Sequence, residues 1–185
     1  MVNLILSGGG RVRDRAAATC KFCDTDFVGA DGPGGGKFAT ADGLARAVEA
    51  HWPRASMAQP YVVCTGGEPL LQIDEALIAA LHGRHFEIAI ETNGTLIPPP
   101  GLEWICVSPK AQAELKLARG NELKLVYPQP GAEPERYAGL PFEHFFLQPM
   151  DNADREANTH AATQYCLAHP QWRLSLQTHK LIGIR

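Results

Sequence analysis

The sequence lacks the features that mark several large classes of protein. Its 185 residues carry 17 lysines and arginines against 20 aspartates and glutamates, so the formal net charge is −3 and no basic excess points to nucleic acid or an anionic membrane. No apolar run approaches the roughly 20 residues that a membrane-spanning helix needs. No basic leader precedes the first apolar residues, which are interrupted at Asn3. These absences favour a small molecule as the partner and the cytoplasm as the location.

Cysteine is scarce, and its distribution excludes a disulfide framework. The five cysteines are an odd number, and only Cys20 and Cys23 are closely spaced. In a reducing cytoplasm such a pair is better explained as a metal or redox site than as a structural bridge. Cys64, Cys106 and Cys166 stand singly in apolar surroundings, so no second pair completes a zinc ribbon. We expect Cys64 and Cys106 to be core residues.

The composition predicts an ordinary globular core in a single domain over residues 1–185, with 45% apolar and 20% charged residues. Short segments rich in β-branched or aromatic residues predict strands at 61–65, 86–91, 104–107, 122–127, 144–148 and 172–177, with a candidate seventh at 2–6. Helices are predicted at 41–51, behind a Thr40 cap, and at 74–82 and 157–168. This alternation favours an α/β fold with a mostly parallel sheet. Because a closed eight-fold barrel needs about 200 residues or more, we expect a partial, open parallel β/α barrel.

Small polar motifs follow five of the predicted strands. In a parallel barrel the carboxyl ends of the strands lie on one face, so these motifs are expected to converge on a ligand site. Turn residues that simply end a strand are the alternative for each motif taken alone. The motifs are Thr65-Gly66-Gly67-Glu68-Pro69, Glu91-Thr92-Asn93-Gly94, Ser108-Pro109-Lys110, Gln148-Pro149-Met150-Asp151 and Gln177-Thr178-His179-Lys180.

The segment most suited to bind a metal ion or cluster is Cys20-Lys21-Phe22-Cys23-Asp24-Thr25-Asp26-Phe27. Two thiolates separated by two residues can ligate one metal ion or cluster, because the short loop puts both sulfurs on one side of the backbone. A thioredoxin-like redox pair would follow a strand directly and open a helix. Here the pair precedes an aspartate-containing segment and a glycine-rich loop, so the redox interpretation is the weaker one.

Taken in order from residue 20 to the end, these motifs resemble those of the 7-carboxy-7-deazaguanine synthases, which are radical S-adenosylmethionine (SAM) enzymes of queuosine and 7-deazapurine biosynthesis. The resemblance implies a partial barrel in which three thiolates hold a [4Fe–4S] cluster and one iron chelates SAM. It implies a lyase in which a 5′-deoxyadenosyl radical abstracts hydrogen from 6-carboxy-5,6,7,8-tetrahydropterin, and ring contraction with loss of ammonia gives 7-carboxy-7-deazaguanine. A homodimer and a flavodoxin-type electron donor are further implications.

The same resemblance assigns roles to residues of this sequence, without naming a catalytic side chain. Cys20 and Cys23 would be two cluster ligands, and Thr25 would offer an oxygen to a Mg²⁺ ion beside the substrate. Substrate contacts would come from Thr65, His179 and the main-chain carboxylate of Arg185. Contacts to the cofactor would come from Phe22, Asp24, Gly66, Gly67, Glu68, Glu91, Asn93, Ser108, Pro109, Lys110, Gln148, Pro149, Met150 and Asp151. The alternatives are a solvated strand end for Glu91, an ordinary surface lysine for Lys110 and a structural histidine for His179.

Near its start the sequence departs from the family. A cluster of this class needs three thiolates, yet no cysteine precedes Cys20, and Val2-Asn3-Leu4 has valine where the family has cysteine. The family's first strand, with a Gln-Gly-Glu motif and a substrate-binding arginine, is also missing. We favour a fragment that is inactive or nearly so as written, because every downstream motif is intact. The alternatives are a degenerate homologue that binds SAM or a pterin without catalysis and, more weakly, a short radical-activating enzyme.

Overall fold

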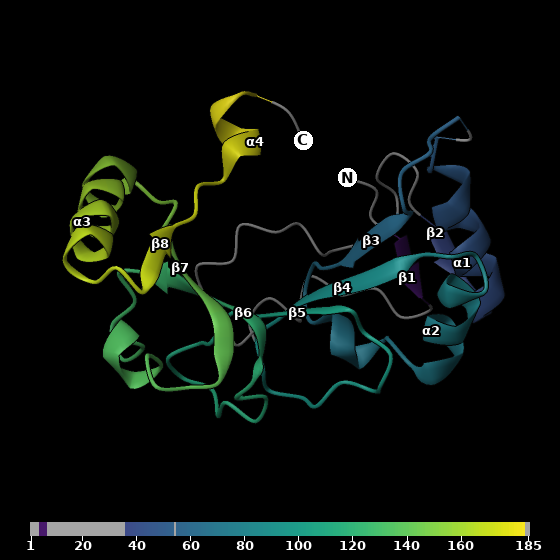
Figure 1. The fold of residues 1–185 in the computed structure, drawn as a ribbon, viewed down its shortest axis with the longest axis horizontal. Helices are drawn as coiled ribbons and strands as arrows, with labels where there is room; N and C mark the ends of the chain where they lie inside the picture. Colours follow the sequence, from purple (N-terminus) through teal and green to yellow (C-terminus); the bar gives the residue numbers. More distant parts are fainter. Residues whose placement is uncertain (1–3, 7–35, 54, 184–185) are drawn as a thin grey trace. The chain divides into compact units, whose positions relative to one another are not determined.

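The computed structural model describes residues 4–6, 36–53 and 55–183, and the chain divides into two compact units (Figure 1). Unit 1 takes in Met1–Thr92 and Ile97–Ile105, and unit 2 takes in Asn93–Leu96 and Cys106–Arg185. The boundary therefore falls within β5 (Trp104–Val107).

Unit 1 is built from parallel strand pairs and two helices. β1 (Leu4–Leu6) pairs with β2 (Gly36–Phe38), and β3 (Tyr61–Cys64) pairs with β4 (Glu87–Thr92), all in parallel. The helices are α1 (Ala41–Ala50) and α2 (Glu75–His82), with a short 3-10 turn, η2 (Pro69–Leu71), between β3 and α2. Parallel neighbours require a crossover connection, and α2 lies in the one between β3 and β4, whereas α1 connects β2 to β3.

Each helix of unit 1 begins at a side-chain cap that the sequence provides. The Thr40 hydroxyl accepts a hydrogen bond from the Gly43 N–H at 3.1 Å, which confirms the cap predicted for α1. The Asp74 carboxylate accepts from the Leu77 N–H at 2.8 Å and starts α2 in the same way. Such caps satisfy one of the backbone donors left unpaired at a helix start, and each is worth about 1 kcal/mol.

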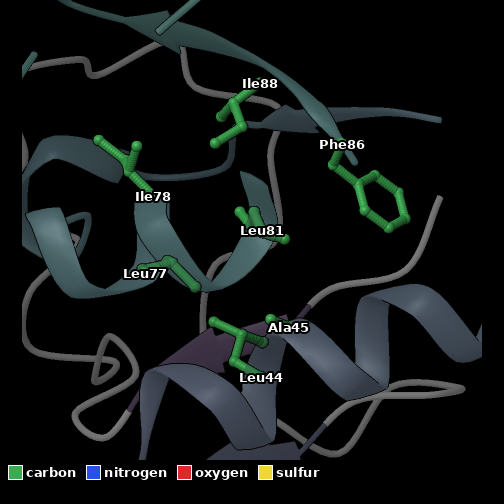
Figure 2. Close-up of a cluster of buried hydrophobic side chains, with 7 residues drawn as sticks. All are labelled: Leu44, Ala45, Leu77, Ile78, Leu81, Phe86 and Ile88. Atoms are coloured by element: carbon green, nitrogen blue, oxygen red, sulfur yellow. The ribbon is translucent and has the colours of Figure 1, made fainter. Parts of the chain in front are cut away.

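Apolar side chains of α1 and α2 form the core of unit 1 with residues of β4 and the turn before it (Figure 2). The apolar positions of α2 are spaced three and four residues apart, so they share one helix face. Burial of each large aliphatic side chain contributes about 1.5–3 kcal/mol. The cluster comprises Leu44, Ala45, Leu77, Ile78, Leu81, Phe86 and Ile88.

Unit 2 continues with β6 (Gly120–Tyr127), β7 (Phe142–Pro149) and β8 (Trp172–Leu174), which follow the last residues of β5 in sequential, parallel order. α3 (Arg155–Ala168) packs against β7 and β8, and α4 (Thr178–Leu181) follows β8. In the described chain β8 has β7 as its one strand neighbour, so the sheet is open, as expected. Its core includes Leu123, Leu125 and Leu147, all fully buried.

The predicted α/β fold with an open parallel sheet is confirmed, and the strand boundaries differ by two residues or fewer except at β8. The strand expected at 172–177 ends at Leu174, because the chain turns into α4 at Gln177. Neither β2 nor α4 was expected, since neither contains a run of apolar residues. The proline-containing connection between β6 and β7 holds a single 3-10 turn, η3 (Pro134–Arg136). None of the helices in the described ranges combines the length and apolarity needed to cross a membrane.

Candidate functional site

In unit 1 the motifs after β3 and β4 meet through their side chains. The two strands are parallel and in register, so their carboxyl ends lie side by side. The Thr65 hydroxyl donates to the Glu91 carboxylate at 3.4 Å, and the Thr92 hydroxyl donates to Glu68 Oε1 at 2.7 Å. Two of the motifs that the sequence predicted to converge are therefore joined by two side-chain hydrogen bonds.

Glu68 is the most firmly held acidic side chain of this pair of motifs. Its Oε1 accepts the Thr92 hydroxyl and also the Leu70 N–H at 3.1 Å, which caps η2. Thr92 is buried, and a hydroxyl-to-carboxylate hydrogen bond of 2.7 Å falls in the short range typical of charge-assisted bonds. A carboxylate fixed in this way is suited to bind an ammonium group.

The glycine turn before Glu68 leaves its backbone uncovered. Gly66 has a φ of +116°, a conformation that glycine adopts without strain, and a Cβ atom there would meet no heavy atom within 4 Å. Packing therefore does not require a glycine at this position, whereas the backbone conformation does. An exposed backbone beside a held carboxylate lets a small ligand approach closely.

The motif after β4 continues into unit 2 as a tight turn. Asn93 Oδ1 accepts the Thr95 N–H at 2.9 Å, and the Gly94 carbonyl accepts the N–H groups of Lys116 and Leu117, both at 2.9 Å. Gly94 has a φ of +77°, and a Cβ atom there would lie 2.6 Å from Leu115 Cδ1. Both the backbone and the packing of this turn thus require glycine.

Two further motifs of unit 2 are fixed by local contacts. Lys110 Nζ donates to the Ser108 hydroxyl at 2.7 Å, and Pro109 between them is fully buried. At the end of β7 the Met150 N–H donates to the Tyr127 carbonyl of β6 at 2.8 Å. Lys110 is therefore held by its own motif, and both interpretations of it, a contact to SAM and an ordinary surface lysine, stay predictions.

The last predicted motif lies against the loop after β7. Lys180 Nζ forms an ion pair with Asp151 Oδ2 at 2.5 Å, which joins Gln177–Lys180 to Gln148–Asp151. His179 lies in α4 and is exposed. The structure thus brings two more motifs together within unit 2, while the predicted substrate contact of His179 stays a prediction.

Several predicted site residues lie outside the described residues, and their roles stay predictions: Cys20, Phe22, Cys23, Asp24, Thr25 and Arg185. Among the described residues, no group of three or more His, Cys, Asp or Glu side chains could hold a metal ion. Burial raises the pKa of the Cys64 thiol to about 11, and Cys106 is buried and donates from its sulfur to Glu122 at 3.4 Å. Cys106 is thus a buried core thiol, as expected, whereas Cys64 is partly buried and packs against the core of unit 1.

The sequence interpretation gave no role to three residues that hold these motifs in place, although Thr92 stands in one of the motifs. The buried polar residues of the described chain are Thr92, Gln129 and Asn158, and each hydrogen-bonds a loop that follows a strand. Asn158 on α3, for example, donates to the Met150 carbonyl at 2.9 Å. Gln129 stands between two prolines in a predicted turn, and a polar residue in that setting carries no sequence signal of burial.

Comparisons with known proteins find relatives over nearly the whole chain. No family model matches the chain. The chain is 66% identical over 175 residues to the 7-carboxy-7-deazaguanine synthase of Bordetella pertussis, and the alignment covers 95% of this chain and 83% of the relative. The protein of the same name from Caulobacter vibrioides is 63% identical with the same coverage, and that from Bacteroides thetaiotaomicron is 42% identical over 167 residues, which are 90% of this chain and 81% of the relative.

A solved structure supports the same relationship. The crystal structure of QueE from Escherichia coli superposes with a TM-score of 0.58 and 29% sequence identity, covering 76% of this chain and 64% of that chain. The fold, the strand-end motifs and the sequence identity over nearly the whole chain all agree. The chain belongs to the 7-carboxy-7-deazaguanine synthase family.

Proposed function

We propose that the protein is a radical SAM lyase that converts 6-carboxy-5,6,7,8-tetrahydropterin to 7-carboxy-7-deazaguanine with loss of ammonia. The observation that carries this proposal is the 66% identity over 175 residues to a relative named for that product. The alignment covers 95% of this chain and 83% of the relative. The geometry of the loops in unit 1, with Glu68 fixed beside an open glycine turn, suits the binding of the SAM ammonium group.

We propose a [4Fe–4S] cluster, SAM and Mg²⁺ as cofactors. When bound, the cluster and SAM together supply the radical that abstracts hydrogen from the substrate, so the difficult chemistry belongs to the cofactors. Cys20 and Cys23 would provide two cluster ligands, and the hydroxyl of Thr25 would bind Mg²⁺, a cation that prefers oxygen. The sequence has only two closely spaced cysteines, so no residue of this chain is assigned as the third cluster thiolate.

The chain's own residues would bind and orient the two small molecules. Glu68 would accept a hydrogen bond from the SAM ammonium, and the backbone at Gly66 and Gly67 would lie against it. Thr65, His179 and the carboxylate of Arg185 would contact the pterin. The remaining contacts to SAM would come from Phe22, Asp24, Glu91, Asn93, Ser108, Pro109, Lys110, Gln148, Pro149, Met150 and Asp151.

The remaining features of the family are proposals for this chain as well. We propose a single radical SAM domain over residues 1–185, a homodimer and a flavodoxin-type electron donor. A reducing compartment such as the cytoplasm fits the three described cysteines, Cys64, Cys106 and Cys166, all of which are free thiols.

The test is product formation. The protein is reconstituted anaerobically with iron and sulfide and incubated with SAM, Mg²⁺, a strong reductant and the carboxylated tetrahydropterin, and the products are analysed by mass spectrometry. We expect the unaltered protein to form 7-carboxy-7-deazaguanine in amounts far below those from the Bordetella relative, because its sequence offers only two closely spaced cysteines. We expect none from Cys23→Ser, which removes one of the two cluster thiolates. Absence of product from the unaltered protein, while the Bordetella relative turns over in parallel, would contradict the proposal.

A second function is favoured by one observation, the presence of only two closely spaced cysteines in the sequence. A chain that cannot complete the cluster would bind SAM or the pterin without converting them. Calorimetry on the same preparation distinguishes the two functions. Binding of the pterin without product formation supports the second function, and product formation rejects it.

A further inference from the structure

The loop Ser108–Lys110 is held from a neighbouring loop by one buried side chain, Gln129. Gln129 Nε2 donates to the Pro109 carbonyl at 3.3 Å, and its Oε1 accepts the Ala111 N–H at 3.2 Å. The residue is 6% exposed, so its amide oxygen and its amide nitrogen both form these hydrogen bonds in the protein interior. One side chain thus satisfies a carbonyl and an N–H on either side of Lys110.

An amide can make both contacts from a single planar end. It carries a donor and an acceptor, whereas a carboxylate only accepts and an apolar side chain does neither. A buried polar group costs free energy unless it is hydrogen-bonded, so a side chain of this kind in the core needs both partners. The geometry around Ala111 and Pro109 therefore calls for glutamine.

Gln129 itself lies in a turn that is fixed from its other side. The Ala132 N–H donates to the Gln129 carbonyl at 2.9 Å, and Ala132 is fully buried. Glu133 accepts the Gly131 N–H at 2.8 Å, a contact that is the main cause of its lowered pKa, and Arg136 donates to the Gly131 carbonyl. The turn is thus a firm support for the amide.

The turn also approaches the loop directly. Gly131 has a φ of +86°, and a Cβ atom there would lie 3.3 Å from Ala111 Cβ. This close approach and the two hydrogen bonds of Gln129 fix the same short segment, which begins one residue after Lys110. The contacts that follow β6 consequently set the conformation of the loop that follows β5.

We propose that Gln129 is a positioning residue, whose amide holds the loop Ser108–Lys110 in the conformation that binds SAM. The inference rests on the proposed function, in which this loop contacts SAM, and it adds a residue outside all the motifs. Loss of the amide frees the Ala111 N–H and the Pro109 carbonyl, so the loop samples conformations that do not bind. The expected result is weaker SAM binding rather than a slower reaction once SAM is bound.

The test compares Gln129→Met with Gln171→Met. Gln171 is exposed and donates to the Ala138 carbonyl at 2.8 Å, so the control removes a similar hydrogen bond from the same unit. We expect Gln129→Met to speed hydrogen exchange of the Ala111 amide at least tenfold and to raise the apparent KM for SAM about tenfold, with kcat changed less than threefold. Gln171→Met is expected to change neither.

A second variant covers the case in which Gln129→Met does not fold. Gln129→Glu keeps an acceptor for the Ala111 N–H, and its buried carboxyl group donates to the Pro109 carbonyl only while it is protonated. We therefore expect its KM for SAM to rise with pH relative to that of the unaltered protein, while its Ala111 amide stays slow in exchange. An unchanged Ala111 exchange rate in Gln129→Met, or a KM for SAM equal to that of Gln171→Met, overturns the inference. Absence of product from the unaltered protein instead overturns the proposed function, and the exchange rate of Ala111 still decides whether Gln129 holds the loop.

Discussion

Thr92, Gln129 and Asn158 show how single residues hold the loops at the strand ends. Each is buried, and each directs its polar atoms at a loop rather than at solvent. Burial strengthens such contacts and makes an unpaired polar group costly. Residues with this combination of burial and hydrogen bonding are therefore the ones whose loss affects the candidate site most.

The hydroxyl of Thr92 is expected to hold Glu68 for SAM binding. Thr92→Val keeps the shape of the side chain and removes the donor to Glu68, and a hydrogen bond to a charged group contributes about 1.5–3 kcal/mol. We expect the apparent KM for SAM to rise about tenfold or more in Thr92→Val. Thr92→Ser retains the hydroxyl and should stay close to the unaltered protein. Equal KM values for the two variants would show that the hydroxyl does not act through Glu68.

The thiol of Cys64 is expected to make the stability of the protein fall as the pH becomes alkaline. Burial raises the pKa of its thiol to about 11 in the folded state, whereas an exposed thiol titrates near 8.5. As the pH rises from about 9 to about 11, the unfolded chain has released this proton and the folded chain still binds it. The unfolded state then binds fewer protons, so the free energy of unfolding falls with rising pH.

Urea unfolding of the protein and of Cys64→Val between about pH 8 and pH 10.5 checks this effect. We expect the stability of the unaltered protein to fall relative to that of the variant as the pH rises, because valine does not titrate. Parallel pH dependences of the two proteins would mean that the thiol titrates normally in the folded state.

At the scale of the elements, α1 and α2 are joined by polar contacts as well as by their apolar core. Arg84, directly after α2, donates to Asp42 at 2.7 Å and to Glu49 at 3.2 Å on α1, and to the Ala80 carbonyl at 2.9 Å. The hydrogen bond from Arg84 is the main reason that the pKa of Asp42 lies below its ordinary value. One guanidinium thus bridges the two helices.

We expect Arg84→Met to lower the melting temperature and to raise the pKa of Asp42. Arg46→Met is a matched control, because Arg46 also pairs with Asp42 at 3.1 Å but has a side chain that is 66% exposed, against 18% for Arg84. Exposed ion pairs contribute little to stability, so the control should melt with the unaltered protein. Calorimetry and NMR titration measure the two effects, and equal melting temperatures of the two variants would exclude the bridge.

The turn between β4 and β5 is expected to tolerate no side chain at Gly94. Gly94→Ala would place a Cβ atom 2.6 Å from Leu115 and 2.8 Å from Val107, at a φ of +77°. We expect a loss of about 1–3 kcal/mol in the free energy of unfolding, from strain and overpacking together. Gly139→Ala is the control, because a Cβ atom there meets nothing within 4 Å. A similar stability of both variants in denaturant would contradict the close packing of this turn.

Most elements of this fold could be predicted from local patterns. The strands β5, β6 and β7 show as apolar runs, and the caps at Thr40 and Asp74 mark the helix starts. β2 and α4 could not be predicted, because Gly36–Phe38 and Thr178–Leu181 lack the run of apolar residues that marks the other short elements. Their position depends on partners far along the chain, which a single sequence does not reveal.

For the molecule as a whole, the order of the motifs predicted the family, and the relatives confirm it at up to 66% identity. Motif residues of the candidate site could be predicted because they follow strand ends in a fixed order. The residues that support them could not, since the contacts of Gln129 and Asn158 arise only from packing. Polar residues in turns and helices usually face solvent, so the residues next to Gln129 and Asn158 in the sequence give no sign that these two side chains are buried.

The central claim is that the strand-end loops of this chain bind SAM. The most direct measurement is hydrogen exchange of the anaerobically reconstituted protein with and without SAM, followed by mass spectrometry of its peptides. We predict slower exchange in the peptides that contain residues 65–68, 108–110 and 148–151, with no change in the peptides of α1. Equal exchange of these loops with and without SAM, at SAM concentrations that saturate the Bordetella relative, would contradict the account.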